Sequence, residues 1–408
     1  MYLTREEEEM LRGDQGEAKA FALRVIIKVG EALGADRLVK IRHAHISGAS
    51  YSTIGDAGLE FIESLLDMGA RVSVPSTMNP IGFEETDPEA LPFTTITPDY
   101  YEAQTRILRA MIRMGVDPIL TCTPYYTDLA KRYGLSQGDH VSWGESSAVL
   151  YANSILGLRT NREGGPLALM SAITGLTYYS GLHTPEGRAP KRIYTIANAS
   201  RELDEAEAGV LGELIAKIHP DDSPPIVNTR FSGDPSLREF MAALGTAGPL
   251  GMVYIPGVTP EKAPVDTRDL EKIEIDYSEI RGILEDRKPP TRPDIVYIGC
   301  PHAGHEDLLL VYKILKSTGA RPKSLLLVSL SRDVYEKARK NGIIGELASM
   351  GVRFVRDTCL IVSPFGSRRN DRVSVATNSY KAFFYLSRKG VKAYLAPLEK
   401  LVEYSIGG

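Results

Sequence analysis

The sequence predicts an α/β protein built from several units whose sheets are mostly parallel. Short apolar runs alternate with amphipathic segments of helical period, and the alternation recurs in the first and last thirds of the 408 residues. A chain of this length exceeds what one hydrophobic core usually organises. We therefore expect an N-terminal α/β unit over 1–140, a middle α/β region over 141–255, a linker or wrapping arm over 256–293, and a C-terminal doubly wound α/β unit over 294–408.

The first third supplies helices and strands in alternation. An amphipathic segment at 17–34 predicts a helix, and the short apolar run at 37–41 predicts the strand that follows it. Strands joined by helices of this length form βαβ units, which build a parallel sheet. The same order, helix and then strand, is expected twice more, at 57–69 with 70–74 and at 97–115 with 116–121.

The last third repeats this plan more clearly. It holds four apolar strands and three amphipathic helices, the first of which is closed by Gly319. This order is typical of a doubly wound α/β unit. The strands are expected at 293–299, 323–330, 352–357 and 391–397, and the helices at 305–319, 332–351 and 378–390.

The middle of the chain is less regular. Residues 147–157 and 167–176 have helical periodicity with small side chains, which is typical of tightly packed, buried helices. Residues 256–293 are rich in Pro and charged side chains, which favours a linker or an arm that wraps another unit.

Composition excludes several classes of protein. The net charge of −4 and the pI near 6.1 give no electrostatic basis for binding nucleic acid. No apolar run approaches the ~20 residues that a membrane span needs, and the N-terminus lacks the basic-then-apolar order of a signal peptide. We expect a cytoplasmic protein that binds neither nucleic acid nor membrane. Scarce Gln beside abundant Arg and Glu is typical of a thermophile's protein.

The three cysteines share one position relative to the predicted strands. Cys122, Cys300 and Cys359 each lie at, or just past, the carboxyl end of a strand. Ligands of open α/β sheets bind at this edge, so we expect the three thiols to meet at one site. Other polar residues share this position: His43, His45, Ser76, Thr77 and Asn79.

Three interpretations of the cysteines stay open on the residues alone. They could be buried structural thiols, or zinc ligands with His302 or His305 as the fourth ligand. They could also hold an iron–sulfur cluster. A [4Fe–4S] cluster held by three cysteines leaves one iron open, and that iron can bind a substrate's hydroxyl and carboxylate as a Lewis acid. The absence of a C-x-x-C pair makes the spacing itself weakly specific.

Seven segments, taken together and in order, resemble the signature blocks of the aconitase X family. They span most of the chain: IRHAHISGASYSTIG, PSTMNPIGF, LTCTPYY, SWGESSAVLYANSILGLRTNREGGP, YIGCPHAGHEDL, RDTCLIVSP and ATNSYKAFFYL. The resemblance implies an aconitase-like fold, with several α/β units around a central cleft. It also implies that the swivelling domain, with a catalytic serine, is absent from this chain and belongs to a separate small subunit.

The resemblance further implies a hydro-lyase with an iron–sulfur cluster, [4Fe–4S] with one open iron, held by Cys122, Cys300 and Cys359. Two activities are known in the family: dehydration of (R)-5-phosphomevalonate to trans-anhydromevalonate 5-phosphate in the archaeal mevalonate pathway, and dehydration of cis-3-hydroxy-L-proline. The thermophile-like composition and the basic loop 363–372 favour the phosphorylated substrate, because arginine forks bind phosphate. A non-catalytic metal-binding α/β protein is the remaining alternative.

Roles for individual residues complete the prediction. Glu145, Ser147 and Lys381 are expected to be catalytic, although a Glu that caps a helix and a surface Lys are the plainer interpretations. Arg159 and Arg162 compete with the basic loop as phosphate contacts. The residues expected to bind substrate are Ser76, Thr77, Asn79, Ser146, Asn153, Arg159, Asn161, Arg368, Asn378 and Ser379.

Overall fold

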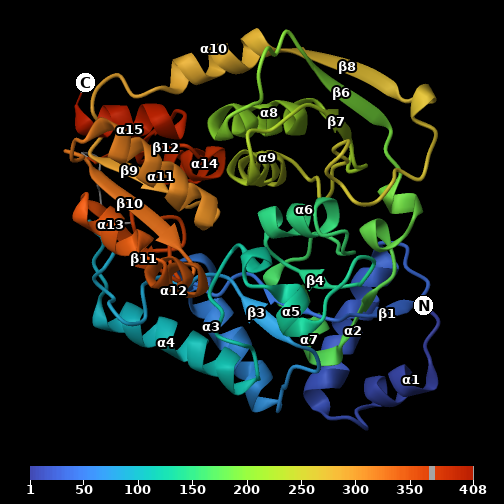
Figure 1. Cartoon of the computed structure of the whole chain (residues 1–408). Coiled ribbons are helices and arrows are strands. Elements are labelled where there is room, and N and C mark those ends of the chain that lie inside the picture. Colours follow the sequence, from blue (N-terminus) through green and yellow to red (C-terminus); the bar gives the residue numbers. More distant parts are fainter. Residues whose placement is uncertain (367–372, 408) are drawn as a thin grey trace.

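The computed structural model describes residues 1–366 and 373–407. Figure 1 shows helices α1 to α7 with the first strands on one side, the β6–β8 sheet with α8 and α9 above them, and the C-terminal sheet with its helices beside both. Among the described residues, three sheets contain only parallel pairs and a two-stranded sheet is antiparallel. The predicted α/β class with mostly parallel sheets is therefore confirmed.

The N-terminal elements form a small parallel sheet packed between helices. Thr4 and Glu7 cap the first helix reciprocally, since each side chain bonds the other's backbone amide. The sheet order is β3-β2-β4, and β1 pairs with β5 in a separate antiparallel pair. The helices are α1 (Arg5–Arg12), α2 (Glu17–Ala32), α3 (Tyr51–Asp67), α4 (Pro98–Arg113), α5 (Leu129–Tyr133), α6 (Ser146–Ser154) and α7 (Gly165–Thr174). The strands are β1 (Leu38–Lys40), β2 (Ala44–Ile46), β3 (Ser76–Met78), β4 (Ser142–Trp143) and β5 (Leu176–Tyr178), and η1 (Pro124–Tyr126) is a 3-10 turn.

Two strand predictions in this region were wrong. Residues 70–74 form no strand, because the amides of Val72 and Ser73 donate to carbonyls at the ends of α4 and α7. The strand β3 begins just after them. Residues 116–121 make only a bridge between Leu120 and Met78, since Pro118 has no amide hydrogen to continue a ladder. Ser76, Thr77 and His45, which we expected just past strand ends, lie inside strands instead: Ser76 and Thr77 in β3, and His45 beside them in β2.

The middle elements form a second parallel sheet, with the order β7-β6-β8. The segment 256–293, expected to be a linker or wrapping arm, contributes the strand β8 and the helix α10. We did not recognise the alternating pattern EKIEID within this Pro-rich and charged segment. These six residues form β8, and all six pair with β6. The elements are β6 (Arg192–Ala197), α8 (Glu205–Ile218), β7 (Ile226–Asn228), α9 (Asp234–Ala247), β8 (Glu271–Asp276) and α10 (Tyr277–Arg287), with short turns η2 (Gly181–His183), η3 (Glu186–Arg188) and η4 (Thr267–Asp269).

The C-terminal unit has the predicted doubly wound topology, with one more strand than we expected. Its parallel order is β11-β10-β9-β12-β13, so the direction of winding reverses between β9 and β12. The sequence prediction missed β12 and the last helix α15. The elements are β9 (Ile295–Ile298), α11 (His305–Thr318), β10 (Leu325–Leu330), α12 (Arg332–Lys340), α13 (Ile343–Ser349), β11 (Val352–Arg356), β12 (Ser374–Thr377), α14 (Tyr380–Arg388), β13 (Lys392–Leu395) and α15 (Leu398–Ile406).

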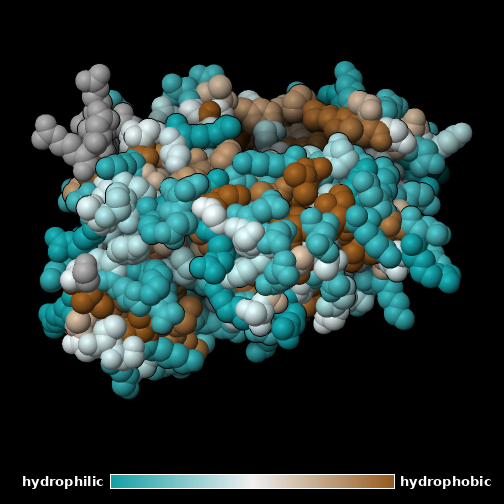
Figure 2. All heavy atoms as spheres, turned by 90° about the horizontal axis from the view of Figure 1, so that it is seen from above, coloured by the Kyte–Doolittle hydropathy of each residue, from teal (hydrophilic) through white to brown (hydrophobic). Residues whose placement is uncertain are grey.

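Separate hydrophobic cores lie beneath the sheets, and the surface is mainly polar. Helix α7, which we assigned to the middle region, packs in the first core together with α2 and the strand β5. The face shown in Figure 2 is mostly hydrophilic, with apolar patches between polar side chains. Among the described residues, no helix has both the length and the apolar character that crossing a membrane requires.

Candidate active site

All three cysteines line one cavity of about 700 Å³. Cys122 follows the bridge that joins Leu120 to Met78 of β3, Cys300 follows β9, and Cys359 follows β11. The cavity therefore lies where the N-terminal and C-terminal units face each other, at the carboxyl ends of their strands, as parallel-sheet geometry predicts. The structure thus brings the three thiols to the wall of one cavity.

The turn that presents Cys300 requires a glycine before it. Gly299 has a φ of +112°, in the region that side chains rarely adopt. A Cβ at this position would lie 2.1 Å from the carbonyl oxygen of Ser329 on the neighbouring strand. The backbone of β9 can therefore turn toward the cavity only because residue 299 has no side chain.

His302 ties the three cysteine-bearing loops together. Its backbone amide donates to Sγ of Cys122 at 3.2 Å. Burial lowers the pKa of His302 to about 4, so the ring is neutral at physiological pH. Its Nε2 then donates to the carbonyl of Thr358 at 3.1 Å, which leaves Nδ1 to accept from the hydroxyl of Thr121 at 3.3 Å. The two threonines directly precede Cys122 and Cys359.

Ser379, which lies between β12 and α14, supports the loop that carries Cys300 after the neighbouring strand β9. Its hydroxyl donates to the carbonyl of Cys300 and accepts from the amide of Ala382 at 3.2 Å, where it caps α14. Ser379 is fully buried and does not line the cavity. Its hydrogen bonds therefore support the loop that carries Cys300, in addition to capping the helix α14.

The three cysteines offer thiol donors to a metal centre. They are free thiols, and burial raises the pKa of each, so each ionises only when a cation replaces its proton. In residues 1–366 and 373–407 we find no group of three or more His, Cys, Asp or Glu side chains that could hold a metal ion in this structure.

A buried ion pair faces the thiols across the cavity. Nζ of Lys381, on α14, contacts a carboxylate oxygen of Glu145, at the start of α6. Glu145 also accepts from the hydroxyl of Ser147 and from the amide of Ala148 at 2.7 Å. Burial alone would raise the pKa of Glu145, but Lys381 and these hydrogen bonds outweigh it and lower that pKa. Glu145 is therefore ionised.

Lys381 stays charged although it is only 8% exposed. Burial acts to lower its pKa, but the Glu145 carboxylate and the nearby thiols raise that pKa above its ordinary value. The hydroxyls of Ser146 and Ser147 lie 3.5 Å from its Nζ. The structure thus brings together four residues that we predicted at the site, and it makes Glu145 the partner of Lys381.

A second predicted group forms part of the cavity wall. Burial lowers the pKa of His45 to about 4, so this ring is also neutral. Its Nε2 donates to Oδ1 of Asn79 at 2.9 Å, and its Nδ1 accepts from the Thr77 hydroxyl at 2.8 Å. Asn79 lines the cavity, whereas Thr77 and Ser76 lie behind it. The Ser76 hydroxyl donates to the Val74 carbonyl at 2.9 Å.

The remaining predicted substrate residues lie away from the cavity. Asn153 is buried, and its side-chain amide donates to the carbonyls of Thr160 and Gly251 at 2.8 Å each. The others are Arg159, which pairs with Glu261 at 3.7 Å, Asn161, whose amide donates to the Ser180 carbonyl, and Asn378, which is buried. Arg368, with Arg369 and Arg372 of the same basic loop, lies outside the described residues.

The cavity wall also contains charged residues that we did not predict as site residues. Glu163 and three cations, Arg162, Arg388 and Lys389, line the same space as the thiols. Lys389 donates to carbonyls of the loop after Cys359, including Ile361 at 2.7 Å. The one signal for Glu163 in the sequence is its place before Gly-Gly-Pro at the start of a helix. We had noted Arg162 as a phosphate contact.

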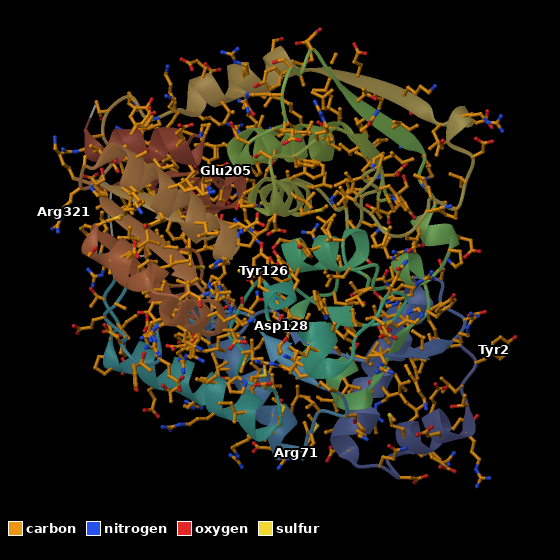
Figure 3. The ribbon with its side chains drawn as sticks, viewed as in Figure 1. Tyr2, Arg71, Tyr126, Asp128, Glu205 and Arg321 are labelled. Atoms are coloured by element: carbon orange, nitrogen blue, oxygen red, sulfur yellow. The ribbon has the colours of Figure 1, made fainter. Side chains whose placement is uncertain are left out.

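A buried polar network beneath the cavity joins all three parts of the fold. Arg238 on α9 donates to both oxygens of Asp307 on α11, at 2.5 and 2.9 Å. It also lies 3.3 Å from the hydroxyl of Tyr126, four residues after Cys122. Asp307 in turn accepts from the Gly304 amide at 2.7 Å. Figure 3 shows Tyr126 at the centre of the molecule, where these elements approach one another.

Three family models match almost the whole chain. They are the aconitase X first domain over residues 1–186, the second domain over 190–285 and the third domain over 293–407. A solved structure of Thermococcus kodakaraensis aconitase X, in its holo-form, matches with a TM-score of 0.89 and 34% identity. The match covers 99% of this chain and 100% of that chain.

Relatives named for two activities also match. The phosphomevalonate dehydratase large subunit of Aeropyrum pernix is 54% identical over 98% of this chain and 99% of its own length. The protein of the same name from Thermococcus kodakarensis is 35% identical over 99% of both chains. A cis-3-hydroxy-L-proline dehydratase of Pseudomonas aeruginosa is 31% identical over 98% of this chain but 69% of its own length. On this evidence, the chain belongs to the aconitase X family.

Proposed function

We propose that this chain is the large, cluster-binding subunit of a hydro-lyase that dehydrates (R)-5-phosphomevalonate to trans-anhydromevalonate 5-phosphate. The observation that carries the proposal is the cavity itself, which three free thiols line together with an ionised Glu145–Lys381 pair. The relatives named phosphomevalonate dehydratase large subunit support this substrate, since they match over nearly their whole length with the higher identity.

The thiols of Cys122, Cys300 and Cys359 would hold an iron–sulfur cluster, for which we favour [4Fe–4S]. When bound, such a cluster with one iron that lacks a cysteine supplies a Lewis acid for the substrate's hydroxyl and carboxylate oxygens. The chain's own contribution is to hold the three ligands in place, through His302 and Ser379, and to keep their surroundings dry.

The cations of the cavity suit an anionic substrate. The Lys381 ammonium, held by Glu145, is placed to contact the substrate carboxylate and to stabilise the charge that develops there as the C2 proton leaves. Arg162 and Arg388 line the same cavity and offer guanidinium groups to the phosphate. The base that accepts the proton would be a serine on the swivelling domain of a separate small subunit, so the large chain alone should be inactive.

A substrate comparison tests this proposal. The chain, reconstituted anaerobically with iron and sulfide, is assayed with and without the small subunit on mevalonate 5-phosphate and on cis-3-hydroxy-L-proline. We expect turnover only with the small subunit, and kcat/KM about 10⁴-fold higher for mevalonate 5-phosphate, because the cationic cavity would be left unpaired by a substrate without phosphate. Turnover of hydroxyproline alone, or full activity of the single chain, would contradict the proposal.

A further inference from the structure

Glu163 is a buried carboxyl group in the cavity wall for which the proposed function has not yet named a role. Its side chain is 4% exposed and lines the same cavity as the three thiols. One oxygen, Oε2, accepts from the hydroxyl of Tyr178 at 3.3 Å. The other, Oε1, is buried and has no hydrogen-bond partner among the described residues. Because this atom belongs to a residue that lines the cavity, a ligand bound there could supply its missing partner.

The backbone places Glu163 beside the other carboxyl group of the cavity. Its amide donates to the carbonyl of Trp143 at 3.2 Å, and Trp143 forms a parallel bridge with Arg162. The residues that follow, Gly144 with Glu145 on one segment and Glu163 on the other, therefore emerge from the same sheet edge. Immediately after Glu163 the chain enters α7, so the side chain stands on a rigid support.

The surroundings push the two carboxyl groups toward opposite protonation states. Lys381 and hydrogen bonds lower the pKa of Glu145, despite its burial, whereas burial raises the pKa of Glu163 to about 7 and the Tyr178 hydrogen bond only partly opposes this. When the environment pushes the pKa values of two carboxyl groups in one site apart, one group can act as an acid while the other stays an anion. The charged or titratable groups that line the cavity with Glu163 are Arg162, Glu145, Lys381, Arg388, Lys389 and the thiols of Cys122, Cys300 and Cys359, and Tyr178 contacts Glu163 directly.

We propose that Glu163 is the acid of the dehydration and gives its proton to the departing hydroxyl group. In this step, which rests on the proposed function, the C3–O bond breaks and its electron pair stays on oxygen. The Oε1–H bond of Glu163 breaks, and its proton joins that oxygen to form water. The base on the small subunit takes the C2 proton, and the C2–H electrons form the double bond. The base then returns its proton to solvent, and Glu163 regains one from solvent.

Glu163→Gln in the complex with the small subunit tests this role. The amide keeps the shape of the side chain but has no proton to give, so we expect kcat to fall about 10²–10⁴-fold with KM nearly unchanged. Wild-type activity should fall as pH rises through about 7, where Glu163 loses its proton, and the residual activity of the variant should lack that fall. Tyr178→Phe removes a hydrogen bond that lowers the Glu163 pKa, so it should move the fall to higher pH.

A second readout follows the proton without any turnover. Infrared difference spectra between pH 5.5 and 8.5, chosen about 1.5 units on either side of the Glu163 pKa, should show a carboxylic acid band in the wild type that is missing in Glu163→Gln. Glu60→Gln, an exposed residue on α3, should match the wild type in both experiments. An active wild type whose rate and pH profile survive Glu163→Gln would overturn the acid role alone. A wild-type complex that turns over no mevalonate 5-phosphate would overturn the proposed function, and the acid role with it.

Discussion

Lys381→Met is expected to lower kcat on mevalonate 5-phosphate by about 10²–10³-fold, because it removes a cation aimed at the developing carboxylate charge. The same change leaves the Glu145 carboxylate buried without its counter-charge. The pKa of Glu145, now lowered by Lys381, should then rise under the influence of burial. The measurement is steady-state kinetics of the reconstituted two-subunit complex, with iron content determined for each variant.

The ion pair predicts a specific failure of additivity. Glu145→Gln should also impair turnover, because it releases the Lys381 ammonium from the position that the carboxylate gives it. If the two groups act as one unit, the double variant should be little worse than the poorer single variant. Lys313→Met, which removes an exposed lysine from α11, should retain wild-type kinetics. Independent, multiplying losses in the double variant would contradict a shared role.

Arg238→Met is expected to cost about 3–5 kcal/mol of stability, because it removes one partner from a buried ionic network. The arginine is 1% exposed and donates to both oxygens of Asp307. Without it, the Asp307 carboxylate stays buried with its main counter-charge gone. Differential scanning calorimetry should show the first unfolding transition lowered by on the order of 10 °C.

Controls separate the lost charge pair from lost packing. Combining Arg238→Met with Asp307→Leu removes both charges, so part of the lost stability should return. Arg109→Met, at an exposed position on α4, should leave the transition unchanged. Because Arg238 also contacts the Tyr126 hydroxyl near Cys122, the single variant should lose iron faster on exposure to a chelator. Unchanged unfolding in Arg238→Met would show that the network stabilises nothing.

The location of the site followed from the sequence because it depends on local rules. An apolar strand and the polar residue after it can be recognised from a few neighbours, and parallel strands bring such residues to one edge. Cys300 after β9 and Cys359 after β11 were placed in this way. Cys122 lies at the same edge, although the strand that we predicted before it is only a bridge at Leu120.

Pairings across the fold could not be predicted in the same way. Lys381 and Glu145 are 236 residues apart, so nothing local distinguishes their ion pair from a surface lysine and a helix cap. The pKa of Glu163 depends on its burial and on the hydrogen bond from Tyr178, which are properties of the folded chain and not of neighbouring residues in the sequence. Asn153 and Asn161 looked equally suitable as substrate contacts, but their side chains bond to the backbone.

The iron and acid-labile sulfide content per chain, measured after anaerobic reconstitution with electron paramagnetic resonance alongside, tests the cluster most directly. We predict about four irons and about four sulfides in the wild type, and their loss in Cys300→Ser, together with loss of the resonance signal that the wild type gives after reduction with dithionite. Stoichiometric zinc would contradict this, as would a metal-free wild type whose stability Cys300→Ser leaves unchanged. Either result would return the three thiols of the cavity to a structural role.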